Sequence, residues 1–182
     1  MYRNVFVLLI VAGIGLLSSC HNSGGQEDMT TVAARNRILQ QSDGTIALKV
    51  DKAACYSDKM NPSSNTAEWN VVVAKSGRYD VWLSSATKDT TNLDYRNSVK
   101  FNFQDNSLEA RPECDKVIHN AGDVAYPYYK TDSFLGSLYI QDPGEYNVQV
   151  ISDGIRPKAK SGQDVKSTAT RMLSVVLKPT TH

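Results

Sequence analysis

The sequence predicts an all-β domain, an antiparallel β-sandwich of two packed sheets. From residue 45 onward, β-branched and aromatic residues gather in short runs in which polar and apolar side chains alternate. Turn-forming residues separate these runs, and no long stretch has the periodicity of an amphipathic helix. Strands that each bury one face are expected to pack as two layers around a shared core.

Seven strands are predicted in chain order, at residues 45–50, 68–73, 78–85, 98–103, 134–140, 145–151 and 171–177. In the second of them Trp69, Val71 and Val73 share one face, as an alternating strand requires. Short segments rich in turn-forming residues predict hairpin connections at residues 75–77, 104–106 and 142–144.

A secretory signal is expected before this domain. Arg3 precedes an apolar run over residues 5–17, which is shorter than the roughly twenty residues that a membrane-spanning helix needs. The run closes on Leu17-Ser18-Ser19-Cys20, which resembles the bacterial lipobox that is cut before its cysteine. We therefore expect a signal peptide over residues 1–19 and a membrane anchor, such as palmitate, on Cys20. An ordinary signal peptide with an incidental cysteine is the alternative.

Residues 20–43 are expected to form a lipidated flexible tether, followed by one sandwich domain over residues 44–182. Within the tether, Glu27-Asp28 resembles the acidic signals that direct some Gram-negative lipoproteins to the outer face of the cell, although a solvated linker explains the pair equally well. The expected location is the bacterial cell envelope, as an outer-membrane lipoprotein that is exposed at the surface if the acidic signal operates.

Charge and cysteine content limit the partners and the compartment. The chain has 20 Lys and Arg against 19 Asp and Glu, with no basic run, so nucleic acid is not an expected partner. With Cys20 assigned to lipid, Cys55 and Cys114 remain in a compartment where disulfides persist. We predict that they form a disulfide; two buried thiols are the alternative, because sequence does not show the distance between them.

Two hairpin patterns carry a family resemblance. Ala67-Glu68-Trp69-Asn70-Val71-Val72-Val73 with Gly77-Arg78-Tyr79-Asp80-Val81, and later Gly144-Glu145-Tyr146-Asn147-Val148, resemble the galactose-binding-like β-sandwich modules that accompany bacterial fucosidases and sulfatases. The likeness spans most of residues 45–179 and implies a jelly-roll carbohydrate-binding module, here without a fused catalytic domain. Members with calcium carry acidic ligands near both ends of the domain. Asp51 and Asp164 are a poor pair for that role, so no metal or other cofactor is expected.

Catalytic signatures are absent from the sequence. It has no His-Glu-x-x-His, Gly-x-Ser-x-Gly, P-loop or dinucleotide-binding pattern, and His119 is the one histidine that is neither in the tether nor terminal. We therefore do not expect an enzyme. A minor alternative is a glycoside-active enzyme built on loop carboxylates such as Asp89, Asp94, Asp123 and Asp132.

Candidate ligand-binding residues lie in the longer loops, 86–97, 122–133 and 152–168, which strand counting places at one end of the sandwich. Tyr126-Pro127-Tyr128-Tyr129 offers flat rings on which a sugar can stack, although tyrosines that cap the core are the alternative. The predicted ligand-binding set is Asp94, Tyr95, Arg96, Tyr126, Tyr128, Tyr129 and Arg156. Alternation turns Trp82 to the other side of its sheet, either as a ligand platform or as a packing residue.

Two classes of function follow from this sequence. The first is a surface module that binds glycan, and the second is a structural or adhesive lipoprotein that holds another envelope protein. Glycan binding should depend on the tyrosines and be competed by free sugar. An assembly role should survive sugar and yield a co-purifying envelope protein.

Overall fold

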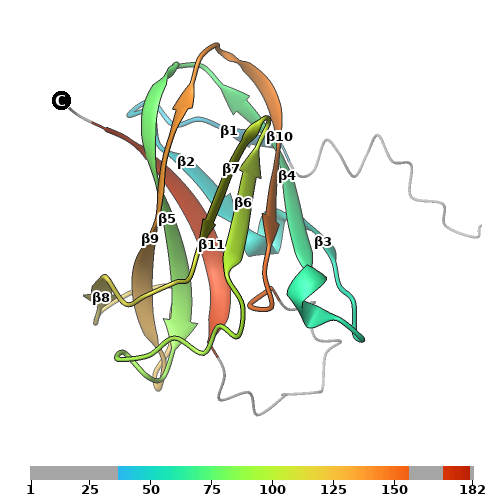
Figure 1. Ribbon diagram of the computed structural model, residues 1–182. Coiled ribbons are helices and arrows are strands. Elements are labelled where there is room, and N and C mark those ends of the chain that lie inside the picture. The colour runs from blue at the N-terminus through green and yellow to red at the C-terminus, as the bar shows by residue number, and fades with distance from the viewer. Residues whose placement is uncertain (1–36, 156–169, 181–182) are drawn as a thin grey trace, which may run out of the picture.

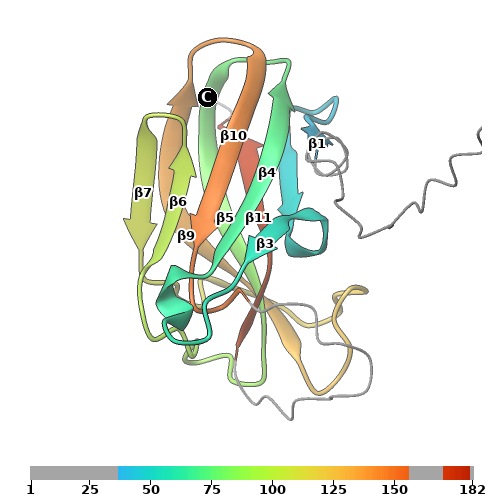
Figure 2. The ribbon, with the colours of Figure 1, turned by 90° about the vertical axis from the view of Figure 1, so that its right-hand side faces the viewer.

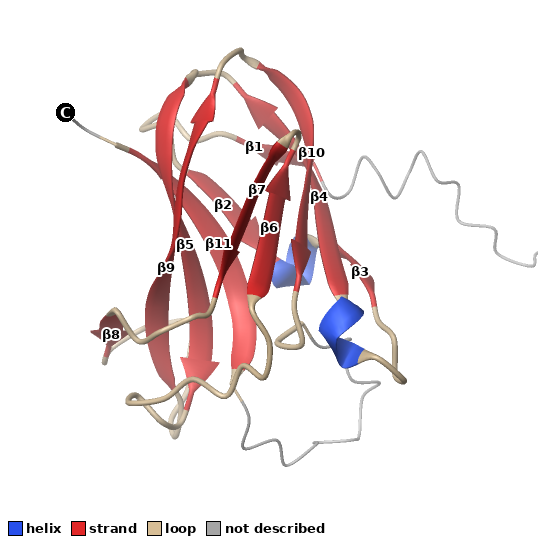
Figure 3. Cartoon of the chain, viewed as in Figure 1, coloured by secondary structure: helices blue, strands red, loops and turns tan. Residues whose placement is uncertain are grey.

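Two β-sheets form the described part of the chain, residues 37–155 and 170–180 of a computed structural model (Figure 1). The six-stranded sheet contains β1 (Arg37–Leu39), β3 (Ala54–Tyr56), β4 (Thr66–Val73), β6 (Val99–Phe103), β7 (Asn106–Ala110) and β10 (Gly144–Ile151). The five-stranded sheet contains β2 (Ile46–Lys49), β5 (Gly77–Thr87), β8 (Lys116–Ile118), β9 (Tyr129–Ile140) and β11 (Arg171–Pro179). Two single-turn 3-10 helices, η1 (Val50–Lys52) and η2 (Pro62–Ser64), lie in the connections (Figure 3).

The strand order places neighbours in the sheets that are distant along the chain. The six-stranded sheet has the order β1-β4-β10-β6-β7, with β3 also paired to β4, and the five-stranded sheet has the order β2-β11-β5-β9-β8. The predicted β-sandwich is confirmed, and each of the seven predicted strands overlaps an observed one. Four short strands, β1, β3, β7 and β8, were not predicted as strands.

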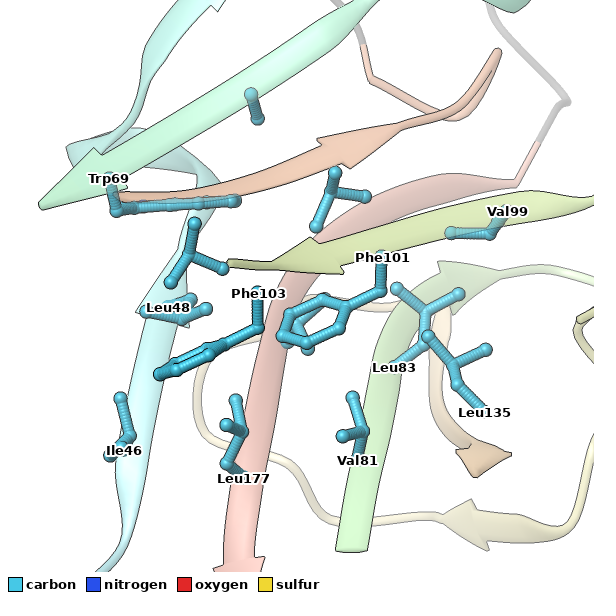
Figure 4. Packing of buried hydrophobic residues seen from close by; sticks show 14 of the residues in the cluster. Ile46, Leu48, Trp69, Val81, Leu83, Val99, Phe101, Phe103, Leu135 and Leu177 are labelled. Carbon is cyan, nitrogen blue, oxygen red and sulfur yellow. The ribbon is translucent and has the colours of Figure 1, made fainter. Parts of the chain in front are cut away.

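The core lies between the two sheets and is filled by alternating side chains of both (Figure 4). Trp69, Phe101 and Phe103 enter from the six-stranded sheet, and Leu83 and Leu177 enter from the five-stranded sheet, all fully buried. The indole N–H of Trp69 donates to the carbonyl of Lys49, 2.9 Å away, so the buried ring also links the two sheets. Each large apolar side chain buried in this way contributes about 1.5–3 kcal/mol to folding.

The sandwich begins earlier than the expected domain boundary at residue 44. β1 pairs with β4, and in parallel, so this sheet is not wholly antiparallel. Immediately after β1, the side-chain oxygen of Gln40 accepts the backbone N–H groups of Ala74 and Lys75 at 2.8 and 2.7 Å. Its side-chain nitrogen donates to the Tyr79 hydroxyl, 2.7 Å away. These bonds hold residues 37–40, which belong to the segment expected to be a flexible tether, against the β4–β5 hairpin.

A β-bulge in β9 decides which of its side chains face outward. Register shifts between Val81, which pairs with Gly136, and Trp82, which pairs with Phe134. Leu135 and Leu138 are both buried although simple alternation would place residues three apart on opposite faces. Gly136 has a φ of +136°, a conformation that glycine tolerates. The bulge therefore keeps both leucines in the core and turns Phe134 outward beside Trp82.

The predicted disulfide between Cys55 and Cys114 is wrong for this structure, in which no bond joins them. Cys55 lies in β3 at one edge of the six-stranded sheet, whereas Cys114 follows β7 at the opposite edge. With β4, β10 and β6 in between, neighbouring strands about 4.8 Å apart separate β3 from β7 by about 19 Å. Bridged cysteines need Cα atoms within about 7 Å. Burial, with the charges of Asp89 and Asp115, raises the pKa of the Cys114 thiol.

The two ends of the sandwich differ in character. Gly77 pairs with Ile140, so the β4–β5 and β9–β10 hairpins meet at what we call the hairpin end. At the opposite end, Thr87 pairs with Tyr129 and Ala86 pairs with Arg171. The connections after β5, before β9 and before β11 therefore share this second end, the loop end, which lies at the bottom of Figure 1.

The expected signal peptide, residues 1–19, and the lipidation site Cys20 lie outside the described residues. Within residues 37–155 and 170–180, no helical segment has the length and apolar character that crossing a bilayer requires.

Candidate ligand-binding site

The most exposed aromatic ring of the predicted site is that of Tyr126, in the connection of residues 119–128 between β8 and β9, which we call the tyrosine loop. Its side chain is 88% exposed. The Tyr126–Pro127 peptide bond is cis, and the backbone N–H of Tyr128 donates to the carbonyl of Ala125 at 3.1 Å. The tyrosine loop is the gold connection at the lower right of Figure 2 and lies at the loop end, and its tight turn leaves the ring of Tyr126 exposed to solvent.

Tyr128 is half-buried and has two cations near its ring. The Nζ of Lys88 is 5.2 Å from the centre of its ring, and the guanidinium carbon of Arg171 is 5.9 Å away. Both cations lie within the range of about 6 Å in which the negative face of an aromatic ring attracts them. Since Lys88 follows β5 and Arg171 begins β11, the tyrosine loop is held against the ends of two strands.

Tyr129 supports the loop from its C-terminal side. It is the first residue of β9, is half-buried, and contacts the ring of His119 edge-on, with ring centres 6.0 Å apart. Next to it, the Nζ of Lys130 donates to a carboxylate oxygen of Asp123 at 2.9 Å. That hydrogen bond, helped by the positive charge, holds the pKa of Asp123 below its usual value. Tyr129 thus has a packing role, whereas Tyr126 is available to a ligand.

The neighbouring segment with Asp94, Tyr95 and Arg96 is tied to the loop end through its backbone. The N–H of Asp94 donates to the hydroxyl of Thr170 at 3.0 Å, and the N–H of Arg96 donates to a carboxylate oxygen of Asp153 at 2.9 Å. The side chains of Asp94 and Arg96 are exposed. They share the loop end with the tyrosines, as predicted.

Tyr95 does not belong to the exposed surface, contrary to its place in the predicted set. Its ring is buried, and its hydroxyl lies 2.7 Å from that of Ser85 in the core. Burial raises the pKa of the Tyr95 phenol, the hydrogen bond with Ser85 opposes this rise, and the charge of Asp153 adds to it. A Cβ at Gly154 would lie 2.4 Å from the ring. Tyr95 therefore packs the connection after β5 against the connection after β10, and its buried ring is not exposed to a ligand.

A short chain of threonine hydroxyls joins the same connections. Thr170 donates to the hydroxyl of Thr87 at 3.1 Å, and Thr87 donates to the carbonyl of Asp89 at 2.9 Å. Both threonines are buried, so these bonds fix the segments after β5 and before β11 to each other. Arg156, the remaining member of the predicted set, lies outside the described residues.

The predicted set omitted an aromatic pair on the outward side of the five-stranded sheet. Trp82 and Phe134 are paired across β5 and β9, with ring centres 5.2 Å apart. The Nζ of Lys116 lies 3.9 Å from the centre of the Trp82 ring, and that of Lys178 lies 5.9 Å away. Alternation along β5 already indicated an outward Trp82. Its partner Phe134 could not be recognised, because the bulge at Gly136 interrupts the alternation of β9.

A hollow of about 280 Å³ lies on the other sheet, between β6 and β10. It is lined by Asn102, Gln104, Glu145, Tyr146, Asn147 and Gln149. Side-chain amides dominate this lining, and they can donate to and accept from hydroxyl groups. Arg37 forms an ion pair with Glu145 at 3.4 Å.

The described acidic and metal-ligating side chains can be compared with the minor alternative of a glycoside-active enzyme. No group of three or more His, Cys, Asp or Glu side chains there is close enough to hold a metal ion. The Thr91 hydroxyl, together with backbone N–H groups, lowers the pKa of Asp89, and Lys130 lowers that of Asp123. A glycosidase acid requires a raised pKa, so neither carboxylate is shifted in the direction of that role.

Comparisons with known proteins concern the fold. No protein-family model matches the chain, and no curated protein matches it. The chain superposes on an α-L-fucosidase from Vibrio sp. strain EJY3 with a TM-score of 0.61 and 18% identity, over 79% of this chain and 24% of that one. For a GH26-CBM35 β-(1,4)-mannanase from Podospora anserina the TM-score is 0.45 and the identity 13%, over 77% of this chain and 28% of that one. For the insecticidal crystal protein Cry2Aa the TM-score is 0.46 and the identity 11%, over 78% of this chain and 22% of that one. The chain thus spans about a quarter of the fucosidase, with which it shares a β-sandwich fold.

Proposed function

We propose that this chain is a cell-envelope lipoprotein whose jelly-roll sandwich acts as a non-catalytic carbohydrate-binding-like module. The observation that carries the proposal is the pair of tyrosines at the loop end. Tyr126 exposes its ring to solvent, and two residues further on the ring of Tyr128 is approached by Lys88 and Arg171. The fold shared with part of a fucosidase, an enzyme that acts on a carbohydrate, also supports a carbohydrate-binding function.

Glycan recognition uses groups of the kind present at this end. The C–H groups of a sugar ring pack on a flat aromatic face, while charged and amide groups bind its hydroxyls. The exposed side chains of Asp94 and Arg96 supply an acceptor and donors at the loop end. Binding of this type requires no side chain with a shifted pKa and no metal ion.

Membrane attachment through lipid on Cys20 completes the proposal. The tripeptide before Cys20 and the acidic pair Glu27-Asp28 support an outer-membrane lipoprotein that presents its module at the cell surface. A module on a lipid anchor would hold glycan close to the membrane.

A glycan-array screen of the purified protein, followed by calorimetry on the best ligand, tests the proposal. Tyr126→Ala should weaken binding about fivefold, because a stacked ring contributes on the order of 1 kcal/mol. Its melting temperature should hardly change, since the ring is exposed. Replacing Tyr126, Tyr128 and Tyr129 together should abolish binding. Tyr56→Ala is the matched control, because Tyr56 is 61% exposed but lies on β3 of the other sheet.

Undiminished affinity of the triple variant would remove the loop end from glycan binding. An envelope protein that co-purifies with the chain and is not displaced by sugar would replace the glycan module with an adhesive or structural function. Release of free sugar from a bound glycan by the purified protein would show a glycoside-active enzyme instead.

A further inference from the structure

The outward side of the five-stranded sheet carries a second set of binding groups, beyond the loop end. We call this surface the basic-aromatic face and define it by Arg78, Trp82, Lys116, Phe134, Tyr139 and Lys178. Register places these residues on one side of the sheet, because Arg78 pairs with Tyr139, Trp82 pairs with Phe134, and Lys178 pairs with the outward Asp80. Lys116 joins them from β8, with its Nζ over the ring of Trp82.

The rings of this face are partly open to solvent. Phe134 is 43% exposed in the middle of β9, and Tyr139 is 58% exposed near its C-terminal end. Trp82 is half-buried between Phe134 and the Lys116 ammonium. The rings of Trp82 and Phe134 are tilted by 52° to each other and, with Tyr139, form an aromatic surface edged by positive charge.

The positive charges of this face have no ion-pair partner among the described residues. Arg78, Lys116 and Lys178 take part in no salt bridge there, whereas the outward cations of the other sheet, Arg37 and Lys100, are paired with Glu145 and Glu109.

The nearby acids of the five-stranded sheet are engaged by hydroxyls. Ser137 donates to Asp80, and Ser84 donates to Asp132, each at 2.6 Å. Both carboxylates keep their negative charge, but the outward cations Arg78, Lys116, Lys178 and Arg171 outnumber Asp80, Asp132 and the neighbouring Asp115. The basic-aromatic face therefore has a net positive charge that an anionic ligand would complement.

This face is continuous with the tyrosine loop. Arg171 and Lys130 are outward residues at its lower margin, because both lie opposite Ala86 in β5. Arg171 approaches the ring of Tyr128, and Lys130 pairs with Asp123 of the tyrosine loop. From Arg78 to Lys88 the strand direction covers about 30 Å at about 3.3 Å per residue. That length suits several consecutive sugars of an extended chain.

We infer that the basic-aromatic face binds an acidic polysaccharide, one that carries carboxylate or sulfate groups along its length and continues from the tyrosine loop. Sugar rings would pack on Phe134 and Tyr139, and the anionic groups would bind Arg78, Lys116 and Lys178. The inference rests on the proposed glycan-binding function and adds the class of glycan to it.

The experiment compares acidic polymers with their own neutral counterparts. Polygalacturonate, alginate and chondroitin sulfate are titrated into the purified protein, each next to a form whose carboxyl groups have been reduced and whose sulfates have been removed. At least one acidic polymer should bind more than tenfold tighter than its neutral form, with an affinity that falls as salt is raised. The double variant Lys116→Gln with Lys178→Gln should bind the acidic polymer about tenfold more weakly, at an unchanged melting temperature. The control variant Lys100→Gln, on the opposite sheet, should bind it as tightly as the wild type does.

The outcomes separate this inference from the proposed function. If neutral glycans bind in a manner that depends on Tyr126 but no acidic polymer is preferred, the acidic ligand is wrong and the glycan module stands. A preference for acidic polymers that the double lysine variant leaves intact also overturns the inference. If poly-L-glutamate or phosphatidylglycerol vesicles bind the Cys20→Ser chain as tightly as the polysaccharides do, the face recognises acidic protein or lipid instead. If no polysaccharide of either kind binds, the proposed function fails with it.

Discussion

Tyr95 offers the sharpest test of how the loop end is built. Its hydroxyl and that of Ser85 lie 2.7 Å apart, and both side chains are buried. Tyr95→Phe leaves the Ser85 hydroxyl without this partner, and Ser85→Ala does the same to the phenol. An orphaned buried hydroxyl costs about 1–3 kcal/mol. In a domain of this size that loss lowers the melting temperature by about 2–12 °C.

The double variant makes the test specific. With both hydroxyls removed, no buried polar group of this pair is left unsatisfied, so Tyr95→Phe with Ser85→Ala should be less destabilised than the sum of the single variants by about 1–2 kcal/mol. Urea denaturation of the four proteins measures this coupling. Additive losses would show that the two hydroxyls do not depend on each other. A Tyr95→Phe protein of unchanged stability but weaker glycan binding would return Tyr95 to the ligand surface.

The same phenol predicts a pH dependence. Burial raises the pKa of Tyr95, whereas in the unfolded chain the phenol ionises near pH 10. The stability that the neutral, buried phenol contributes is therefore complete below about pH 10 and is lost as the pH rises above that value. Wild-type protein should lose more unfolding free energy between pH 9 and pH 11 than Tyr95→Phe does. Equal losses would contradict the buried phenol.

Two further predictions concern the loop end and the anchor. Gly154→Ala should destabilise the protein by about 1–3 kcal/mol in thermal or urea unfolding, because its Cβ would lie 2.4 Å from the Tyr95 ring; Gly122→Ala, with no atom within 4 Å of the added Cβ, is the control and should have no such effect. Cys20→Ser should leave the chain uncut at that site or released from membranes on carbonate washing, because acyl chains stabilise anchoring by about 0.8 kcal/mol per methylene. A mutant that matures normally and stays membrane-bound would contradict the lipoprotein assignment.

The long strands could be predicted because their signal is local. Alternation in β4 and β5 follows from burial of one face, and each predicted range overlaps the observed strand. β1 and β8 are three residues each, too short for alternation to be visible. β1 is held by the Gln40 side chain and by pairing with a strand about thirty residues away. The disulfide prediction was wrong for a related reason, because the spacing of two cysteines along the chain does not show which edges of a sandwich they occupy.

The candidate site was predictable where exposure follows from a turn and not where it depends on packing. Tyr126, next to proline in a polar loop, is exposed as a ligand-binding ring requires. Tyr95 carried a signal that could have identified it as core, because Leu93 and Tyr95 are buried around an exposed Asp94, the same period-two pattern as in the strands. Phe134 had no such signal, since its outward direction depends on the bulge at Gly136.

The position of β1 connects the proposed anchor with the proposed ligand surfaces. The chain enters the described region at Arg37, on the six-stranded sheet, while the basic-aromatic face lies on the outward side of the five-stranded sheet. The thickness of the sandwich, in which packed sheets lie about 10 Å apart, separates the two. A tether that ends at β1 therefore leaves the basic-aromatic face unobstructed at the point where the chain joins the sandwich. A lipid-anchored module that held an extended polysaccharide across β5 and β9 could do so without its own attachment strand competing for the same sheet.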